Sequence, residues 1–432
     1  MILVISCFVV KLTTIYQNVL NVNYNDFGKS EVIVCFIIVV FSIFHLSLIK
    51  KNNHLKHVFM PLIYAYLFRI FLLFWDLYFR EIFNLKNSGA DSEHFFGLAK
   101  AIASGININY MLFVSCMGEF YKVVGVSRLF SQFLLMLCSM VTLYVIVFVL
   151  NKLKIDKQIQ YKTITIVGLL PNFAILSSIY LRESIVTMFA SLSVLCFVYW
   201  MYDKKEIYLG FAIIFTLISS AFHTGAIALL AGFIVVRYLY LKKDNRFEIN
   251  IKNIIPVLLF IVMFSWLYQN HSETFFTKIQ DVESIEDISQ NIERGSSSYA
   301  MYVGASSGIS GIMIYSLPRM FFFLFSPLPW QWRGIQDIIA FIFSSYFYLY
   351  IIVLAIRKVK KFKYTNYDSL NDIQHTIFMG LGILALFTTF VFGWGCNNTG
   401  TAIRHRDKMM CIYAVMLSIV INEKQKVKNQ FS

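Results

Sequence analysis

The sequence predicts an all-α protein that crosses a membrane many times. Of the 432 residues, 58% are hydrophobic and 14% are charged, and the mean hydropathy is +0.65. A soluble chain carries about 25% charged and about 45–50% apolar residues. Long apolar runs also recur along the chain and are separated by basic clusters. These observations exclude a soluble enzyme, a DNA-binding module and a disordered scaffold.

The apolar runs divide the chain into predicted spans, because a helix needs about 20 mostly apolar residues to cross the hydrocarbon layer. We predict twelve spans, at residues 1–20, 31–49, 57–80, 128–150, 162–180, 184–202, 207–222, 223–237, 252–268, 335–356, 374–394 and 408–421. The first run has no basic start and no small-residue cleavage site, so we expect an uncleaved anchor. The short pair from 207 to 237 forms either two tilted spans or one re-entrant hairpin. Residues 1–432 are expected to form a single polytopic domain.

Charge gives the expected orientation. The loops placed inside together carry 22 Lys and Arg against 8 Asp and Glu, and lie at residues 50–56, 151–162, 203–206, 237–252, 357–373 and 423–432. Cytoplasmic loops are enriched in Lys and Arg. The formal net charge of +14 is therefore explained by membrane topology, and no nucleic-acid partner is expected. Both termini are predicted to be cytoplasmic.

Two predicted external regions are long, at residues 81–127 and 269–334. Loops of this length are usually functional or disordered, and their helical texture favours function. Asp91 is expected to cap an interfacial helix that starts near His94. Residues 312–330 are expected to lie in the outer headgroup layer, and Pro327 and Pro329 to stop any helix there.

Charged and polar side chains beside membrane spans are functional candidates, because their burial in lipid is expensive. The predicted topology places one group of them on the external side: Asp91, His94, Arg182, Glu183, His223, Arg294, Arg319, Arg333, Asp337, Arg404, His405 and Arg406. Their shared side is the main clue to function.

The sequence Leu181-Arg182-Glu183-Ser184 interrupts a long apolar stretch and predicts a tight external turn between two spans. Arg182 and Glu183 would then lie at the N-terminus of the returning helix, where free N–H groups and the helix dipole favour an anion. An ion pair with a neighbouring helix is the structural alternative.

Residues 398–408 contain the densest external charge. The apolar run that follows is short, so we expect its helix to begin near Ile403, with Arg404, His405 and Arg406 in the first turn. Positive charge at that end opposes the helix dipole, which favours a bound anion, and Arg binds phosphate oxygens bidentately. The alternative is snorkelling to lipid headgroups.

His223 lies at the junction of the short pair of predicted spans. A histidine there is a candidate general base, and a satisfied core histidine is the alternative. Trp330 and Trp332 form either an aromatic belt or a platform that faces lipid or sugar.

No metal or cofactor is expected. The sequence has no HExxH, P-loop or GxGxxG motif, and its seven cysteines include no CxxC pair. The match to GxSxG at residues 304–308 lacks the strand-to-helix context of a nucleophile elbow. The acidic residues between 281 and 287 are interpreted as a solvated face and not as a site for a divalent cation.

On these residues the chain resembles the Wzy-type, EpsG-like oligosaccharide repeat-unit polymerases (O-antigen polymerases) of bacterial surface polysaccharide pathways. The resemblance is carried by the Asp91 region, the Arg182 turn, Phe222-His223-Thr224, the Ser326–Trp330 stretch and, above all, Gly400-Thr401-Ala402-Ile403-Arg404-His405-Arg406. It implies a GT-C-like polymerase architecture in the bacterial inner membrane, with the active site on the periplasmic side. It also implies membrane lipids and a chain-length regulator as partners.

The reaction that the resemblance implies transfers a growing glycan from undecaprenyl diphosphate to another lipid-linked repeat unit, building O-antigen of lipopolysaccharide, or capsular or exopolysaccharide. Such transfer needs positioning and charge neutralisation. Arg182, Arg404 and Arg406 with His405 are assigned to the donor diphosphate. Arg294, Arg319 and Arg333 are assigned to the acceptor diphosphate or to gating. His223 is the first candidate base, followed by Glu183 and Asp91.

Three alternatives stay open at the level of sequence. A flippase for the same lipid-linked sugar would show related halves and a central cavity with charged walls. A related lipid-linked glycosyltransferase or O-antigen ligase would differ in its acceptor. A receptor or permease without catalytic activity is the third.

Overall fold

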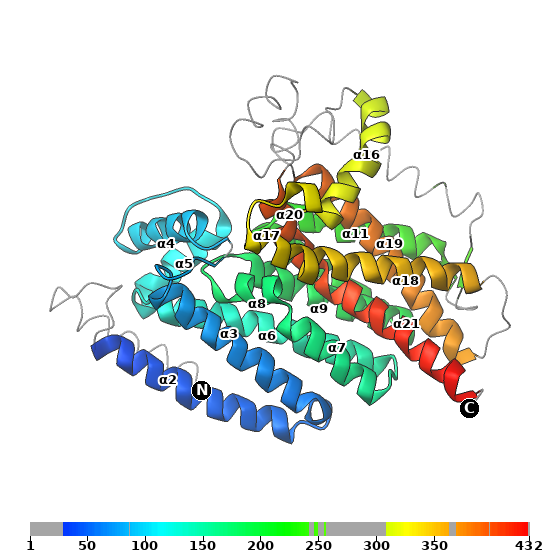
Figure 1. The fold of residues 1–432 in the computed structure, drawn as a ribbon, viewed down its shortest axis with the longest axis horizontal. Coiled ribbons are helices and arrows are strands. Elements are labelled where there is room, and N and C mark those ends of the chain that lie inside the picture. Colours follow the sequence, from blue (N-terminus) through cyan, green and yellow to red (C-terminus); the bar gives the residue numbers. More distant parts are fainter. Residues whose placement is uncertain are drawn as a thin grey trace. The chain divides into compact units, whose positions relative to one another are not determined.

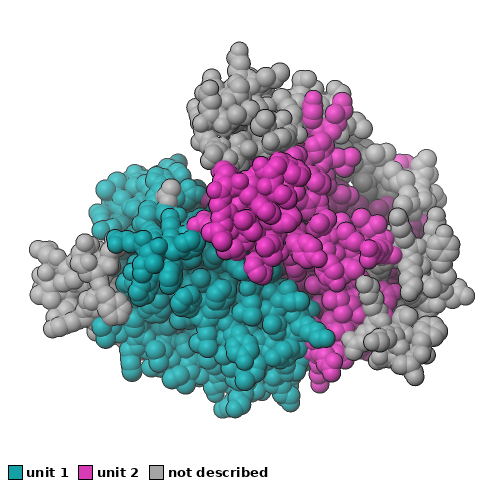
Figure 2. All heavy atoms as spheres, viewed as in Figure 1, with its two compact units in different colours: residues 1–147, 160–188 teal, residues 148–159, 189–432 magenta. Residues whose placement is uncertain are grey.

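The computed structural model of the chain is mostly helical (Figure 1). The structure describes residues 29–85, 87–241, 246–248, 255, 308–362, 369–396 and 398–430. The chain divides into two compact units (Figure 2): unit 1 contains residues 1–147 and 160–188, and unit 2 contains residues 148–159 and 189–432. Each unit is considered by itself.

Six helices among the described residues are long and apolar enough to cross a membrane, and a bent pair of helices raises that number to seven. The prediction of an all-α membrane protein is confirmed at this level. The short pair predicted at 207–237 also forms, as apolar helices below spanning length. The predicted spans 1–20 and, apart from residue 255, 252–268 lie outside the described residues, so the total of twelve stays a prediction.

Unit 1 is built from long helices with two shorter helices at one end (Figure 1). Its elements, some of which continue into unit 2, are α2 (Lys29–Lys51), η1 (Lys56–Val58), α3 (Phe59–Tyr78), α4 (Ala90–Ala103), α5 (Leu112–Val124), α6 (Arg128–Lys152), α7 (Lys157–Leu169), α8 (Pro171–Ser178) and α9 (Glu183–Asp203). The shorter helices α4 and α5 pack against each other, which confirms the helical texture predicted for residues 81–127; their external location stays a prediction.

The predicted span at 162–180 is two helices and not one. Helices α7 and α8 meet at Leu170 and are bent by 58°. Pro171 occupies the first turn of α8. Proline has no N–H to donate and its ring clashes with the preceding turn, so a helix restarts there more readily than it continues.

The predicted cap of the interfacial helix is wrong by two residues. Helix α4 begins at Ala90, with Gly89 as its N-cap, and Asp91 is an exposed residue of the first turn. Gly89 has φ +104°, a conformation that glycine adopts without strain, and its N–H donates to Ser92 Oγ at 3.2 Å. The carboxylate of Asp91 still suits the positive end of the helix dipole.

Unit 2 contains the remaining helices. Its elements are α10 (Glu206–Phe222), η2 (Thr224–Ile227), α11 (Ala228–Leu239), β1 (Tyr240–Leu241), β2 (Arg246–Phe247), α16 (Gly308–Phe325), η3 (Pro329–Gln331), α17 (Ile335–Ala340), the π-helical turn η4 (Phe341–Ser345), α18 (Tyr346–Phe362), α19 (Ser369–Trp394), α20 (Thr399–Arg406), η5 (Asp407–Met409) and α21 (Met410–Gln430). Strands β1 and β2 pair antiparallel.

The described part of the predicted headgroup segment is mostly one helix. Helix α16 runs to Phe325 with Pro318 inside it and packs against α19. It ends before Pro327 and Pro329, as predicted from the two prolines. Its depth in a membrane stays a prediction.

The helix expected to begin near Ile403 begins earlier. Helix α20 starts at Thr399, and the Asn398 side chain accepts a hydrogen bond from the Thr401 N–H at 2.8 Å. Arg404, His405 and Arg406 therefore occupy the last turn of α20 and not the first turn of the next helix. Positive charge at a helix C-terminus is favourable, so the prediction that these charges oppose the helix dipole is wrong.

Candidate functional site

Two histidines from distant parts of the sequence meet in unit 2. His223 lies in extended conformation between α10 and η2, and His405 belongs to the last turn of α20. Their Nε2 atoms are 3.0 Å apart, and the rings meet edge to face with centroids 4.5 Å apart. The structure thus brings together the predicted base and a residue predicted to bind substrate.

Cys396 extends this contact. It follows α19, is 1% exposed, and its Sγ lies 3.0 Å from Nδ1 of His405. Both ring nitrogens of His405 are therefore engaged, one by a thiol and one by an imidazole. An imidazole held at both nitrogens has a defined ring orientation.

Phe392 of α19 packs against both histidines. Its ring centroid is 5.7 Å from that of His223 and 5.3 Å from that of His405. The ammonium of Lys408 lies 5.5 Å from the same ring. Helices α10 and α19 end here and α21 begins just after, so the cluster lies where several helices of unit 2 turn.

The surroundings of the histidines are rich in positive charge. Arg319 is buried, and its guanidinium stacks 4.3 Å from the Trp394 ring. Lys408 is 5% exposed, and Arg404 is half-buried. The run 404–408 carries one carboxylate, that of Asp407. Cationic side chains in a low-dielectric region suit an anionic ligand.

Arg406 is held in place by hydrogen bonds to its neighbours in unit 2. Its guanidinium donates to the Leu324 and Ser326 carbonyls and to Ser345 Oγ, and Tyr348 donates its hydroxyl to the Arg406 carbonyl at 2.9 Å. It is fully buried. Arg406 therefore ties α20 to the end of α16 and to η4, and its predicted contact with a diphosphate stays a prediction.

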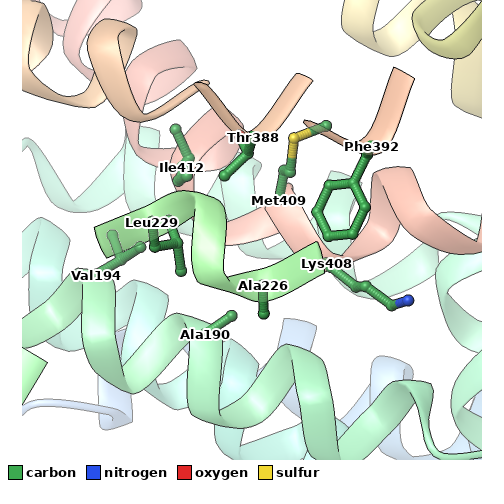
Figure 3. Close-up of a pocket in the computed structure, with 9 residues that line it drawn as sticks. All are labelled: Ala190, Val194, Ala226, Leu229, Thr388, Phe392, Lys408, Met409 and Ile412. Carbon is green, nitrogen blue, oxygen red and sulfur yellow. The ribbon is translucent and has the colours of Figure 1, made fainter. Parts of the chain in front are cut away.

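A small apolar pocket adjoins the histidine cluster (Figure 3). It is lined by Ala190, Val194, Ala226, Leu229, Thr388, Phe392, Lys408, Met409 and Ile412. The Lys408 ammonium points away from the apolar side chains (Figure 3). The cavity measures about 10 Å³, which is room for about one water molecule. In this conformation the cavity is too small to bind a long chain.

Unit 1 holds a different polar network, at the end of α3. The carboxylate of Asp76 is 1% exposed and is contacted by Arg80 at 3.2 Å, by Gln132 Nε2 at 2.9 Å and by the Ser88 hydroxyl. Glu93 of α4 bridges Arg80 and Arg128. The network joins the ends of α3, α4 and α6.

Charge pairing shifts the pKa of Glu93. Partial burial acts to raise it, but hydrogen bonds from Arg128 and Arg80 outweigh burial, so the pKa of Glu93 lies below its ordinary value. The pKa of Arg80 is raised, because the pairing with Glu93 and Asp76 outweighs the opposing effect of its burial. Both shifts favour the ionised forms of Glu93 and Arg80.

The Arg182 turn forms as predicted, between the end of α8 and the start of α9. Arg182 Nη1 lies 3.4 Å from Met111 Sδ, and Glu183 is 3% exposed in the first turn of α9. Both residues belong to unit 1, whereas Arg404 belongs to unit 2. Their predicted convergence on one ligand stays a prediction.

The other predicted residues are more scattered. Arg333 is exposed and its main-chain N–H donates to the Asp337 carboxylate at 3.2 Å. The exposed His94 packs against Tyr110 with ring centroids 5.7 Å apart. Arg294 and the acidic residues from 281 to 287 lie outside the described residues.

Within the described part of the chain, no group of three or more His, Cys, Asp or Glu side chains is arranged to hold a metal ion. Comparison with known proteins returned no match, whether to family models, to curated proteins or to solved structures.

Sequence reasoning missed the Asp76 network and the roles of Cys396 and Phe392. Asp76 had a usable signal, since a carboxylate within an apolar helix is a functional or structural marker. Cys396 had none, because its proximity to His405 depends on how the chain folds between α19 and α20.

Proposed function

We propose that the protein is a glycosyltransferase that polymerises undecaprenyl-diphosphate-linked oligosaccharide repeat units at the periplasmic face of the bacterial inner membrane. The product would be O-antigen, capsular polysaccharide or exopolysaccharide. The observation that carries the proposal is the contact between His223 and His405 at 3.0 Å within a cation-rich end of a bundle of apolar helices.

This arrangement suits transfer from a lipid diphosphate. The leaving group is anionic and already a good one, so the protein has to hold two amphiphilic substrates in line and neutralise developing negative charge. Arginine and lysine side chains do this without a nucleotide or a metal. A histidine next to them can take the proton of the attacking sugar hydroxyl.

The roles follow from exposure. Arg404 is half-buried and is our first choice for the donor diphosphate, together with Arg182. Arg319 and Arg406 are fully buried and would act mainly by shaping the site and its positive potential. His223 is the proposed base, and Arg294 and Arg333 are assigned to the acceptor.

The architecture is part of the proposal. Twelve crossings, a GT-C-like arrangement and cytoplasmic termini agree with the charge distribution of the loops. They also place the ends of α10 and α19, with the histidine cluster, on the periplasmic side. The Arg182 turn falls on the same side.

Deletion of the gene, followed by analysis of lipid-linked products, tests the proposal. We expect single repeat units on undecaprenyl diphosphate to accumulate on the periplasmic side, with no long polymer. Accumulation on the cytoplasmic side would identify a flippase. Free polymer that is made but not transferred to its final acceptor would identify a ligase.

A further inference from the structure

Gln132 of α6 links three parts of unit 1 through one side chain. It is fully buried, and its Oε1 accepts a hydrogen bond from Arg128 Nε at 3.1 Å. Its Nε2 donates to Asp76 Oδ2 at 2.9 Å and to the Ser178 carbonyl at 2.8 Å. Gln132 therefore joins the polar network at the end of α3 to the end of α8.

The partners of Gln132 fix the orientation of its amide. A guanidinium nitrogen can only donate a hydrogen bond, whereas an ionised carboxylate and a backbone carbonyl can only accept one. The side chain at this position must therefore accept on one side and donate twice on the other. A glutamine amide meets this requirement. An ionised glutamate of the same shape has no donor, and methionine has none either.

The bond from Gln132 to Ser178 caps a helix. Ser178 is the last residue of α8, and the next residue, Ile179, is extended, with φ −100° and ψ 163°. A carbonyl in the last turn of a helix lacks an intrahelical N–H partner, and the Gln132 amide supplies a donor there. The Ser178 hydroxyl also donates to the Arg69 carbonyl of α3 at 3.1 Å. The end of α8 is thus fixed against both α6 and α3.

Arg182 follows this fixed end of α8 by only four residues. The intervening residues 179–181 are fully buried, and the hydroxyl of Tyr180 accepts a hydrogen bond from the hydroxyl of Tyr121 at 3.0 Å. The half-buried Arg182 therefore lies at the end of a short buried segment. Gln132 holds this segment at its start, and Tyr121 holds it in its middle.

We propose that Gln132 is the positioning residue for Arg182: by capping α8, it holds the Arg182 guanidinium where the diphosphate of the lipid-linked donor binds. This inference rests on the proposed glycosyl transfer, in which Arg182 contacts the donor. Gln132 itself is buried and acts through the turn. Asp76 then contributes to the same reaction, because its carboxylate accepts from the amide that holds the turn.

Gln132→Met tests the positioning, because it keeps the length of the side chain and removes all three hydrogen bonds. We expect polymer extension to fall about tenfold, since a small displacement of a binding group from its productive position slows transfer. The decisive comparison uses Arg182→Ala. If Gln132 acts through Arg182, the double variant should extend polymer at the same rate as Arg182→Ala alone. Losses that multiply in the double variant would overturn the positioning role.

A second measurement does not depend on polymerisation. Purified full-length protein in detergent is treated with phenylglyoxal, which modifies accessible arginine side chains, and the Arg182 peptide is quantified by mass spectrometry. We expect Gln132→Met to raise the rate of Arg182 modification about fivefold, because the turn opens more often without its anchor. The exposed Arg333 of unit 2 is the internal reference. Equal Arg182 rates in wild type and Gln132→Met overturn the positioning, whether or not the protein is a polymerase.

Gln160→Met is the matched control for loss of a buried glutamine in unit 1. Gln160 of α7 is 2% exposed and its Oε1 lies 2.8 Å from His57 Nε2, so we expect Arg182 to be modified at the wild-type rate. An equal rise in Gln132→Met and Gln160→Met would overturn the proposal.

Gln132→Asn is the second variant if Gln132→Met does not insert. It keeps the amide, but the shorter side chain cannot reach from Arg128 to Ser178, so we expect the rate of Arg182 modification to rise about twofold. A wild-type rate in this variant would also overturn the proposal.

Discussion

The two units each bury a polar cluster, and the clusters differ in charge balance. In unit 1, Asp76 and Glu93 pair with Arg80 and Arg128, so two carboxylates meet two guanidinium groups. In unit 2, the run 404–408 and Arg319 contribute four cationic side chains against the carboxylate of Asp407. The first cluster pairs its carboxylates with its own guanidinium groups, and the second brings more cationic side chains than carboxylates from the described residues named here.

This difference teaches that burial of charge alone does not identify a functional site. Buried ion pairs cost desolvation and are retained when their partners are well placed. A balanced network such as that of Asp76 fixes helix ends. A cluster that combines cationic side chains with a histidine pair contains the residue types that an anion-binding or proton-transfer site uses.

The largest effect is expected at the histidine pair. His223→Ala should reduce polymer extension at least about 100-fold while the protein still inserts, because His223 is at a junction between helices and not inside one. Glycan length in a complemented deletion strain measures this. His57→Ala is the control, since His57 contacts Gln160 in unit 1, and it should leave glycan length unchanged.

The next effect concerns Arg404 and Arg182. We expect Arg404→Ala and Arg182→Ala to leave insertion intact but to reduce extension about 10- to 100-fold, so that cells display single repeat units. Arg404→Lys should restore little, because a point charge replaces a planar fork. Full-length polymer from both alanine variants would contradict the assignment of the donor diphosphate.

Unit 1 should respond in stability. Asp76→Asn removes the charged acceptor of Gln132 and one of the two carboxylates that pair with Arg80, so we expect a loss of about 1–3 kcal/mol in the free energy of unfolding. Thermal unfolding in detergent measures it. Asp91→Asn, at an exposed position of α4, should change stability by less than about 0.5 kcal/mol. Equal losses in the two variants would remove the distinction between the clusters.

The smallest effect concerns pH. Because the pKa of Glu93 is lowered from 4.5 in the folded protein, its stabilising contribution is complete above that ordinary value and is lost as the pH falls through the lowered one. The side chain is 45% exposed, so the contribution is about 0.5 kcal/mol. Glu93→Gln should be less stable than wild type at pH 7 by this amount, and the difference should disappear in acid. A difference that does not shrink as the pH falls would contradict it.

Much of the fold could be predicted, because crossing a membrane imposes long apolar helices. The spans near α3, α6, α9 and α19 follow from their apolar runs, and the Arg182 turn follows from charges within such a run. The break between α7 and α8 has a sequence signal in Pro171, but the flanking residues are as apolar as those of a continuous span, so hydropathy alone does not show it.

The candidate site was predictable only in part. His223 and His405 were each singled out from local sequence, but their contact depends on packing between α20 and the α10–η2 junction. The helix start was misplaced at Ile403 because the apolar run was used to locate it. Asn398, a good capping residue, was the better signal, and it changes how the charges of Arg404 and Arg406 relate to the dipole.

Gly225 lies close to Phe392 and His223 of the histidine cluster. A methyl group on Gly225 would come within 2.5 Å of the Phe392 ring, which is closer than such atoms approach in proteins, and within 3.3 Å of the His223 ring, which is a tight contact. Gly225→Ala would therefore displace the Phe392 ring, which packs against both imidazoles, without removing any polar group. The packing of the two histidines thus depends on the absence of a side chain at position 225 as well as on the side chains that contact them.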